Sequence, residues 1–213
     1  MKKSEHIYQK IFKRLFDIVF SITILLLLSP FLIILALCIV IDDGLPVIFH
    51  QKRSGLNDVP FQIFKFRTMK NKQVPVESNS HNDYNWQYRV PDDFVFKSAD
   101  ENNPNITKVG RFMRKYSLDE LPQFINVLKG DMSVIGPRPE ILPISQCYDK
   151  EQKKRLKVKP GVSGWAQVNG RSEMNHGEKI RYDLYYVENI SVGLDFKILF
   201  KTASHVFVGK GSV

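Results

Sequence analysis

An unbroken apolar run near the start of the chain dominates its pattern of hydrophobic and polar positions. Residues 18–41 hold no charged side chain across 24 positions. A straight helix of that length extends about 36 Å, enough to cross a hydrocarbon core of roughly 30 Å. A buried core helix is the alternative, but a helix that is apolar on every face is unusual in a small domain. The pattern therefore predicts membrane insertion.

Ser29 and Pro30 stand at the midpoint of this run. Proline removes a helical hydrogen bond, and a serine hydroxyl can bond back to the helix backbone and add to a bend. Both flanks of the run carry net positive charge, which favours the cytoplasmic side for both. We therefore predict a re-entrant helix-break-helix whose two arms, about 12 residues each, reach roughly the bilayer centre. A kinked helix that spans the membrane is the alternative.

The pattern changes to short β-rich and polar segments after residue 44. Two β-rich runs within 45–69 flank Gly-Leu-Asn-Asp at 55–58, which predicts a hairpin or a short loop. Residues 70–104 are rich in Asn, Ser, Asp and Pro, and predict a long loop.

Helical spacing returns in the second half of the chain. Residues 108–117 place basic and apolar side chains on opposite faces, which is typical of a helix at a membrane interface or of an ordinary surface helix. Residues 119–129 predict a second helix that ends at a Lys-Gly pair. Turn dipeptides at 159–171 predict a loop that presents groups to a ligand. Residues 181–208 predict an acidic-aromatic helix followed by an apolar amphipathic segment.

These elements together predict an α+β fold in two parts. Residues 1–44 form a basic N-terminal segment and the membrane-embedded re-entrant helix-break-helix. Residues 45–213 form a small mixed cytosolic domain with interfacial amphipathic helices.

The charge balance indicates an anionic partner. The chain has 31 Lys and Arg against 22 Asp and Glu, a net charge of +9, which favours nucleic acid, acidic lipid headgroups or phosphorylated substrates. The apolar run and the lack of a recognised binding motif argue against nucleic acid. Two cysteines and five scattered histidines make neither a disulfide framework nor a zinc site.

The stretch SLDELPQ at 117–123 places two carboxylates side by side in this basic chain. One interpretation is structural: Ser117 and Glu120 fit a capping box, or Asp119 caps the helix and places Pro122 at its third position. The other is chemical, because a carboxylate can attack phosphorus and form an acyl-phosphate. Local grounds alone favour capping and leave catalysis open.

Phosphoryl chemistry needs positioning, cationic neutralisation and a divalent metal. The chain has no P-loop, so phosphate must be held by side chains and loop amides. The candidate cations are Lys65, Arg67, Arg111, Arg114, Arg138 and Arg171.

Several long motifs agree with one family. They are KRLFDI at 13–18, the apolar run with its Ser-Pro break, KFRTM at 65–69, the stretch 108–140, KPGVSGWAQVNGR at 159–171 and YDLYYVENISVGLDFKILFKT at 182–202. With these motifs the chain resembles the monotopic phosphoglycosyl transferases, also called bacterial sugar transferases, over almost its whole length. The chain looks like a minimal catalytic form, because no long multi-span region precedes the motifs.

The resemblance implies a two-step reaction in the first membrane step of bacterial glycan assembly. Asp119 attacks the β-phosphate of a UDP-sugar, UMP leaves, and undecaprenyl phosphate takes the phosphosugar from the covalent intermediate. Glu120 assists in metal binding or in activating the acceptor, and Mg²⁺ lies beside both carboxylates. The implied phosphate and nucleotide contacts are Lys65, Arg67, Arg111, Arg138, Gln167 and Arg171.

The resemblance also implies a place in the cell. The protein would be monotopic in the bacterial cytoplasmic membrane, with both termini and the active site on the cytoplasmic side. A homodimer is one open alternative to a monomer.

Two departures from the family pattern bear on these expectations. Asn103-Pro104-Asn105 stands where family members often have Asp-Pro-Arg, so that arginine has no counterpart here. The polar segment 70–104 is longer than in the smallest members. A non-enzymatic, membrane-anchored scaffold for envelope glycan assembly is the alternative function, and it predicts that both carboxylates are dispensable.

Overall fold

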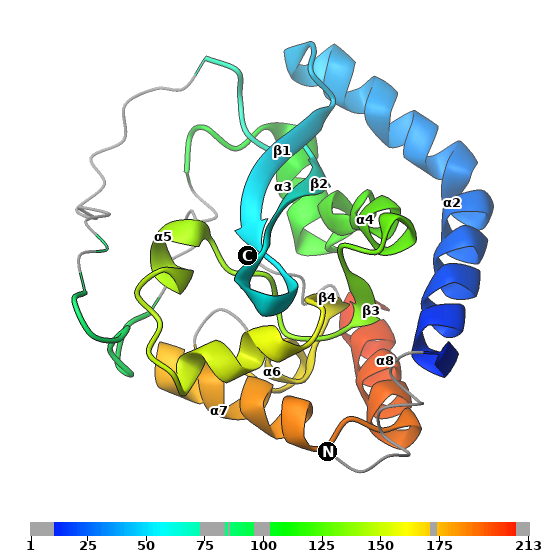
Figure 1. The fold of residues 1–213 in the computed structure, drawn as a ribbon. Helices are drawn as coiled ribbons and strands as arrows, with labels where there is room; N and C mark the ends of the chain where they lie inside the picture. Colours follow the sequence, from blue (N-terminus) through cyan, green and yellow to red (C-terminus); the bar gives the residue numbers. More distant parts are fainter. Residues whose placement is uncertain (1–10, 73–83, 85, 96–102, 171–173, 208–213) are drawn as a thin grey trace.

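The computed structural model describes residues 11–72, 84, 86–95, 103–170 and 174–207. The first ten residues of the basic segment, most of the 70–104 loop, and Arg171 lie outside these described residues. Within them, helices and short strands mix along the chain, so the α+β prediction is confirmed. Figure 1 shows a long N-terminal helix that curves along one side of the body and the shorter elements gathered inside its arc.

The long helix, α2, runs from Lys13 to Asp43 without interruption. The predicted break at Ser29 and Pro30 is therefore not present as a gap in the helix, although the helix bends (Figure 1). Pro30 has no N–H for the Leu26 carbonyl one turn earlier. The Ser29 hydroxyl donates to that same carbonyl at 2.8 Å and supplies the missing hydrogen bond. The helix continues because the local hydrogen-bond loss is repaired.

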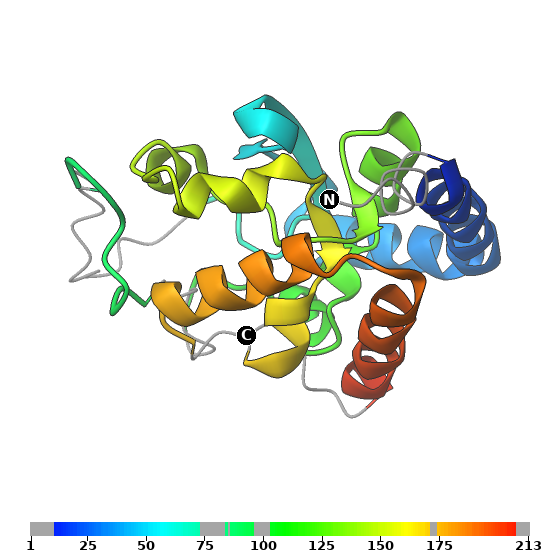
Figure 2. The same cartoon turned by 60° about the horizontal axis from the view of Figure 1, so that its bottom comes forward.

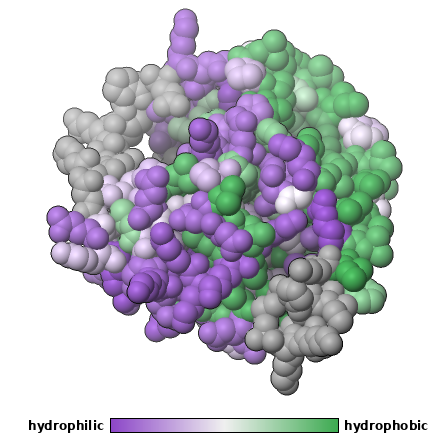
Figure 3. Space-filling view, viewed as in Figure 1, coloured by the Kyte–Doolittle hydropathy of each residue, from purple (hydrophilic) through white to green (hydrophobic). Residues whose placement is uncertain are grey.

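One face of α2 packs on the body and the other is exposed. Leu35 and Ile39 are buried in a cluster with Phe66 and Met113, and the N-terminal half packs against the main core. The outward side chains are apolar and exposed: Leu26, Leu27, Ile33, Ile34, Leu37 and Ile41. Figure 3 shows this apolar surface along the edge that α2 occupies. Within the described residues, α2 is the helix long and apolar enough to cross a membrane.

Polar side chains tie the N-terminal end of α2 to the body. Lys13 Nζ pairs with Asp195 at 2.6 Å, and Arg14 Nη2 donates to the Leu128 carbonyl at 2.8 Å. Asp17, 2% exposed, accepts hydrogen bonds from the Ser133 hydroxyl and from the backbone N–H of residue 134. This end of α2 is therefore docked by directional contacts as well as by apolar packing.

The C-terminal end of α2 is tied to the same body. Asp42 Oδ2 accepts a hydrogen bond from the Val109 N–H at 3.0 Å. Asp43 pairs with Arg67 and accepts from the Asn71 N–H at 2.7 Å. Both ends of α2 thus contact the polar domain.

The predicted hairpin is confirmed. Strand β1 (Ile48–Ser54) pairs antiparallel with β2 (Pro60–Phe66), with Ile48 opposite Phe66. The 3₁₀ turn η2 (Leu56–Asp58) joins them. The predicted basic amphipathic helix is also confirmed as α3 (Lys108–Lys115), whose N-terminus is capped by the Thr107 side chain.

The helix predicted at 119–129 is wrong in its first part. Ser117 adopts a left-handed conformation, a 3₁₀ turn η3 (Leu118–Glu120) follows, and α4 (Gln123–Lys129) begins only after Pro122. The Ser117 side chain makes no capping hydrogen bond to η3, so the capping box is absent. Pro122 lacks the N–H that a continuous helix would need at that point, which splits the segment in two.

The rest of the body is built on a small parallel pair of strands. Strand β3 (Ser133–Ile135) pairs with β4 (Gly161–Ser163). The loop predicted at 159–171 is therefore wrong in part, because it holds β4 and the short helix α6 (Trp165–Asn169). Along the chain, β3 is followed by α5 (Leu142–Ser145) and the 3₁₀ segment η4 (Gln152–Lys157), and then by β4. The predicted acidic-aromatic helix and apolar amphipathic segment are α7 (His176–Glu188) and α8 (Val192–Phe207).

Core side chains join these elements. The main cluster unites β3 and α4 with Tyr186 on α7 and Ile198 on α8. Figure 1 shows α8 beside the N-terminal part of α2, where Phe16 and Phe196 are in ring contact, and α7 along the lower end of the body. In Figure 2 the orange helix α7 crosses the face that has been turned forward. The core thus fixes β3, and with it the loop that follows β3.

Gly110 on α3 gives a stability test of this packing. An added Cβ there would lie 2.3 Å from the Thr68 carbonyl oxygen, a clash with backbone that also accepts the Thr107 N–H. We expect Gly110→Ala to lower the free energy of unfolding by roughly 1–3 kcal/mol. Thermal unfolding in detergent measures it.

Gly193→Ala is the matched control. No atom lies within 4 Å of a Cβ added at Gly193 on α8, so we expect a neutral effect or a gain of up to about 1 kcal/mol. Equal melting temperatures for the two variants would contradict the close approach of α3 to Thr68.

Candidate active site

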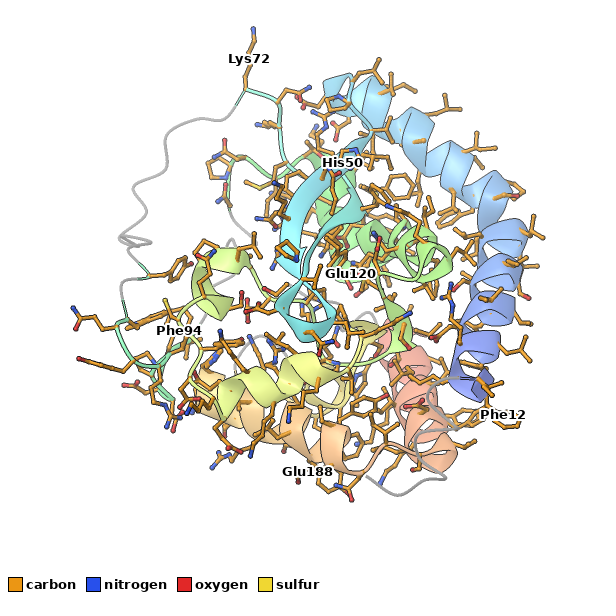
Figure 4. The ribbon with its side chains drawn as sticks, in the orientation of Figure 1. Phe12, His50, Lys72, Phe94, Glu120 and Glu188 are labelled. Atoms are coloured by element: carbon orange, nitrogen blue, oxygen red, sulfur yellow. The ribbon has the colours of Figure 1, made fainter. Side chains whose placement is uncertain are left out.

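Asp119 and Glu120 lie on η3, the single 3₁₀ turn between α3 and α4. Each residue is only 6% exposed. The left-handed φ of 55° at Ser117 turns the chain sharply before them. Successive side chains on a 3₁₀ turn point about 120° apart, so the two carboxylates face different neighbours. Figure 4 shows Glu120 at the centre of the body, between the hairpin and α4.

Glu120 is neutralised by two cations. Its Oε1 accepts from Lys65 Nζ at 2.7 Å and from Arg138 Nη2 at 2.8 Å. Burial alone would raise its pKa, but Arg138 and Lys65 more than offset this and lower the pKa to about 2. Glu120 also raises the pKa of Arg138. Glu120 is therefore an ionised anchor for two cations.

The pKa of Asp119 is shifted in the opposite direction from that of Glu120. Within the described part of the chain, its buried Oδ1 has no hydrogen-bond partner. Burial raises the pKa of Asp119 to about 6, and the charges of Lys65 and Arg138 offset this only in part. The carboxylate is still ionised at neutral pH but poorly stabilised. A carboxylate in this state is more basic than an ordinary aspartate.

Two further arginines lie near the carboxylates. Arg114 Nε donates to Thr68 Oγ1 at 3.0 Å, and burial lowers its pKa while the charge of Asp119 opposes that shift. Arg53 on β1 was not expected from the sequence. Burial lowers its pKa to about 10, and the charge of Arg138 adds to the effect. The pairing of β1 with β2 places Arg53 near the carboxylates, and no local sequence pattern distinguishes Arg53 from the other basic residues.

Other predicted contacts lie elsewhere. Arg67 pairs with Asp43 and donates to the Gly44 carbonyl, so it serves the end of α2. Arg111 is exposed and lines a cavity of about 400 Å³ beside the end of α2. Gln167 Nε2 donates to the Val162 carbonyl at 3.1 Å, while its buried Oε1 has no partner in the described region. Of the predicted cations, the structure brings Lys65, Arg114 and Arg138 to the carboxylates.

Asp119 and Glu120 are the two carboxylates that this turn could offer to a metal ion. Among the described residues no three Asp, Glu, His or Cys side chains gather into a cage for an ion. Magnesium-like cations are usually held by one or two carboxylates, with substrate phosphates and water as the other ligands. The unpartnered Oδ1 of Asp119 fits such a site. The two cations of Glu120 both bind its Oε1.

The family is decided by comparison with known proteins. A family model described as bacterial sugar transferase matches residues 8–209. The chain belongs to the bacterial sugar transferase family. The resemblance stated from the motifs is confirmed.

This bacterial sugar transferase is similar in sequence to several named proteins. A UDP-glucose:undecaprenyl-phosphate glucose-1-phosphate transferase of Escherichia coli (strain K12) is 41% identical over 211 residues, 95% of this chain and 42% of that protein. An undecaprenyl-phosphate galactose phosphotransferase of Salmonella typhimurium is 42% identical, over 94% of this chain and 41% of that protein. The uncharacterized sugar transferase EpsL of Bacillus subtilis (strain 168) is 40% identical, over 94% and 90% respectively. The chain spans less than half the length of the first two relatives.

The two carboxylates of this bacterial sugar transferase are expected to affect folding stability with opposite signs. The pKa of Asp119 lies near 6 instead of 3.8, so ionising it above that pH costs folding free energy, and the cost is absent below about pH 4. Asp119→Asn should raise the free energy of unfolding at about pH 7.5 by roughly 1–3 kcal/mol. Near pH 4 the gain should largely disappear.

Glu120→Gln is the matched comparison. The pKa of Glu120 is lowered from 4.5 to about 2, so its contribution is present above pH 4.5 and is lost as the pH falls through 2. The variant also leaves Lys65 and Arg138 buried without their partner, and we expect a loss of roughly 3–5 kcal/mol at neutral pH. Denaturant unfolding at about pH 7.5 and near pH 4 measures the free energy of unfolding of both variants. Equal losses for both variants at neutral pH would contradict the unequal environments.

Proposed function

We propose that this chain transfers a phosphosugar from a UDP-sugar to undecaprenyl phosphate through a covalent aspartyl-phosphosugar intermediate. The observation that carries the proposal is the unequal treatment of two adjacent buried carboxylates. Glu120 holds Lys65 and Arg138, whereas Asp119 has a raised pKa and an oxygen without a partner among the described residues. One relative is named as a UDP-glucose:undecaprenyl-phosphate glucose-1-phosphate transferase, and another as an undecaprenyl-phosphate galactose phosphotransferase. Both names support a nucleotide-activated sugar and undecaprenyl phosphate as the substrates.

In the first step, an Asp119 oxygen forms a bond to the β-phosphorus of the UDP-sugar. The bond between that phosphorus and the bridging oxygen breaks, and the bridging oxygen leaves with the electron pair as part of UMP. The phosphosugar stays on Asp119 as an acyl-phosphate. Lys65 and Arg138, held by Glu120, are the proposed cations that neutralise charge on the phosphoryl oxygens.

In the second step, a phosphate oxygen of undecaprenyl phosphate forms a bond to the same phosphorus. The bond from phosphorus to Asp119 breaks, and the carboxylate is restored with its electron pair. The product is an undecaprenyl-diphosphate-linked sugar. Asp119 and Glu120 are the proposed carboxylates for a divalent cation, Mg²⁺, which when bound would supply further charge neutralisation to the phosphates.

The remaining predicted residues keep their proposed roles. Arg111 is proposed as a phosphate contact at the cavity beside the end of α2. Gln167, whose Oε1 has no partner among the described residues, and Arg171, which lies outside the described residues, are proposed for the nucleotide. Arg67 is proposed as a further phosphate contact, with Asp43 at the end of α2 as its partner.

We also propose that the protein is monotopic in the cytoplasmic membrane, with residues 1–44 as the re-entrant part and 45–213 as the catalytic part. A helix that crossed the bilayer would place its ends on opposite sides. Here Lys13 and Asp43, at the two ends of α2, both contact the polar body. The exposed apolar face between them is the surface available to lipid. These contacts support placement of both ends on the same side of the membrane, and the positive charge of both flanks favours the cytoplasmic side.

The catalytic proposal is tested with Asp119→Asn. We expect UMP release from UDP-glucose and UDP-galactose, with undecaprenyl phosphate present, to fall to background. Asp119→Glu should also fail, because a shift of about 1 Å costs on the order of a hundredfold in rate. Without acceptor lipid, intact-protein mass spectrometry should show a phosphosugar increment on the wild type alone.

Asp92→Asn is the control, since this carboxylate is exposed and pairs only with Arg89 in the contacts of the described region. It should keep wild-type rates. Full activity in Asp119→Asn would refute the mechanism, and activity absent from every protein would favour the scaffold alternative.

The topology proposal is tested by tagging each terminus and probing intact cells with a membrane-impermeant reagent. Both tags should be protected until the inner membrane is permeabilised. The matched control is a tag on a periplasmic protein in the same cells, which should react at once. An N-terminal tag that reacts in intact cells would contradict the re-entrant arrangement.

A further inference from the structure

The loop at residues 136–140, Gly-Pro-Arg-Pro-Glu, carries Arg138 and is held in an unusual way. Two of its five residues are prolines, which have no N–H to donate. The Gly136 N–H donates to the Ser163 carbonyl at 2.8 Å, and the other contacts that fix the loop backbone are made through its acceptors. The carbonyl oxygens of residues 137 to 140 accept, in that order, from Gly161 N (2.9 Å), Arg155 Nη2 (2.9 Å), Arg53 Nη1 (3.4 Å) and Ser54 N (3.0 Å).

Arg155 is the charged donor at the back of this loop. Its side chain is 1% exposed, and its Nε and Nη2 contact Asp183 Oδ2 at 2.8 and 2.6 Å. Its Nη1 donates to the Tyr148 hydroxyl at 2.9 Å. Burying a guanidinium is costly unless its donors are paired. Asp183, on α7, therefore fixes the direction in which Arg155 points.

Arg138 is held at both ends by these contacts. Its carbonyl accepts from Arg155, and its guanidinium donates to Glu120 at 2.8 Å. The void lined by Arg138, Arg155 and the neighbouring prolines is about 10 Å³, no more than one water needs. The backbone of Arg138 therefore has little room to shift, and a hydrogen bond weakens steeply with misalignment.

We propose that Arg155 and Asp183 are positioning residues that fix the backbone of Arg138 so that its guanidinium meets Glu120. The effect on turnover rests on the proposed function, whereas the effect on the loop does not. Neither residue is expected to touch substrate. Their ion pair joins Asp183 on α7 to Arg155, which lies 28 residues earlier in the chain. Arg155 in turn contacts the backbone of Arg138, whose guanidinium donates to Glu120.

The first test is a double-mutant cycle on UMP release. Asp183→Asn should lower kcat about tenfold in the wild-type background, but by less than about twofold when Arg138→Ala has already removed the guanidinium. A merely structural role would cost the same factor in both backgrounds. Arg155→Lys, which keeps the charge and loses the fork, should follow the same non-additive pattern.

The control is Lys13→Met, which breaks the buried pair with Asp195 at the end of α2. Its effect on kcat, whatever its size, should be the same with and without Arg138. Thermal unfolding of every variant verifies that each is folded at the assay temperature.

The second test needs no activity. Amide hydrogen exchange in a peptide covering residues 133–141 should be faster in Asp183→Asn than in Lys13→Met, because the loop has lost its brace. If the wild type releases no UMP, the proposed function fails and the exchange result alone decides the positioning. Additive kcat losses, or exchange equal to that of Lys13→Met, would overturn the proposal.

Discussion

The site depends on one electrostatic constraint: two neighbouring carboxylates are buried, and the nearby cations serve them unequally. Glu120 Oε1 takes both Lys65 and Arg138, whereas Asp119 Oδ1 takes no hydrogen bond within the described structure. The 3₁₀ turn makes this division possible, because it sends adjacent side chains in different directions. Burial that is only partly offset raises the pKa of Asp119 to about 6, whereas Arg138 and Lys65 lower the pKa of Glu120 to about 2. The hairpin that brings Lys65 and the loop that brings Arg138 both end at this pair.

Local features of this arrangement were predictable from the sequence. The hairpin, α3 and the long apolar helix follow from spacing within a few turns of chain. The two carboxylates are visible in the sequence as adjacent acids near a helix start, with basic residues before them. The predicted start of that helix at 119 is wrong because Asp119 and Glu120 lie on a separate 3₁₀ turn, and α4 begins only after Pro122. The break in α2 was misjudged because the Ser29 hydroxyl restores the hydrogen bond that Pro30 removes.

Long-range pairing was not predictable from the same patterns. Lys65, on β2, and Arg67, directly after it, stand two positions apart, yet one pairs with Glu120 and the other with Asp43 on α2. The choice depends on where α2 ends against the hairpin, which no local spacing encodes. Arg155 and Asp183 are likewise 28 residues apart and belong to elements with unrelated patterns. Such contacts exist only once the tertiary fold has brought their elements together.

The attachment of α2 at both of its ends has a mechanical consequence. The ion pairs of Lys13 and Asp43 fix the two ends of α2 to the body. In the monotopic arrangement proposed above, the apolar outer face of α2 would set how deep the helix lies in lipid, and the carboxylates would move with it as one body. The height of Asp119 above the acyl chains would then be a fixed dimension of the fold. The proposed lipid-phosphate acceptor would reach Asp119 by lateral diffusion, without leaving the bilayer.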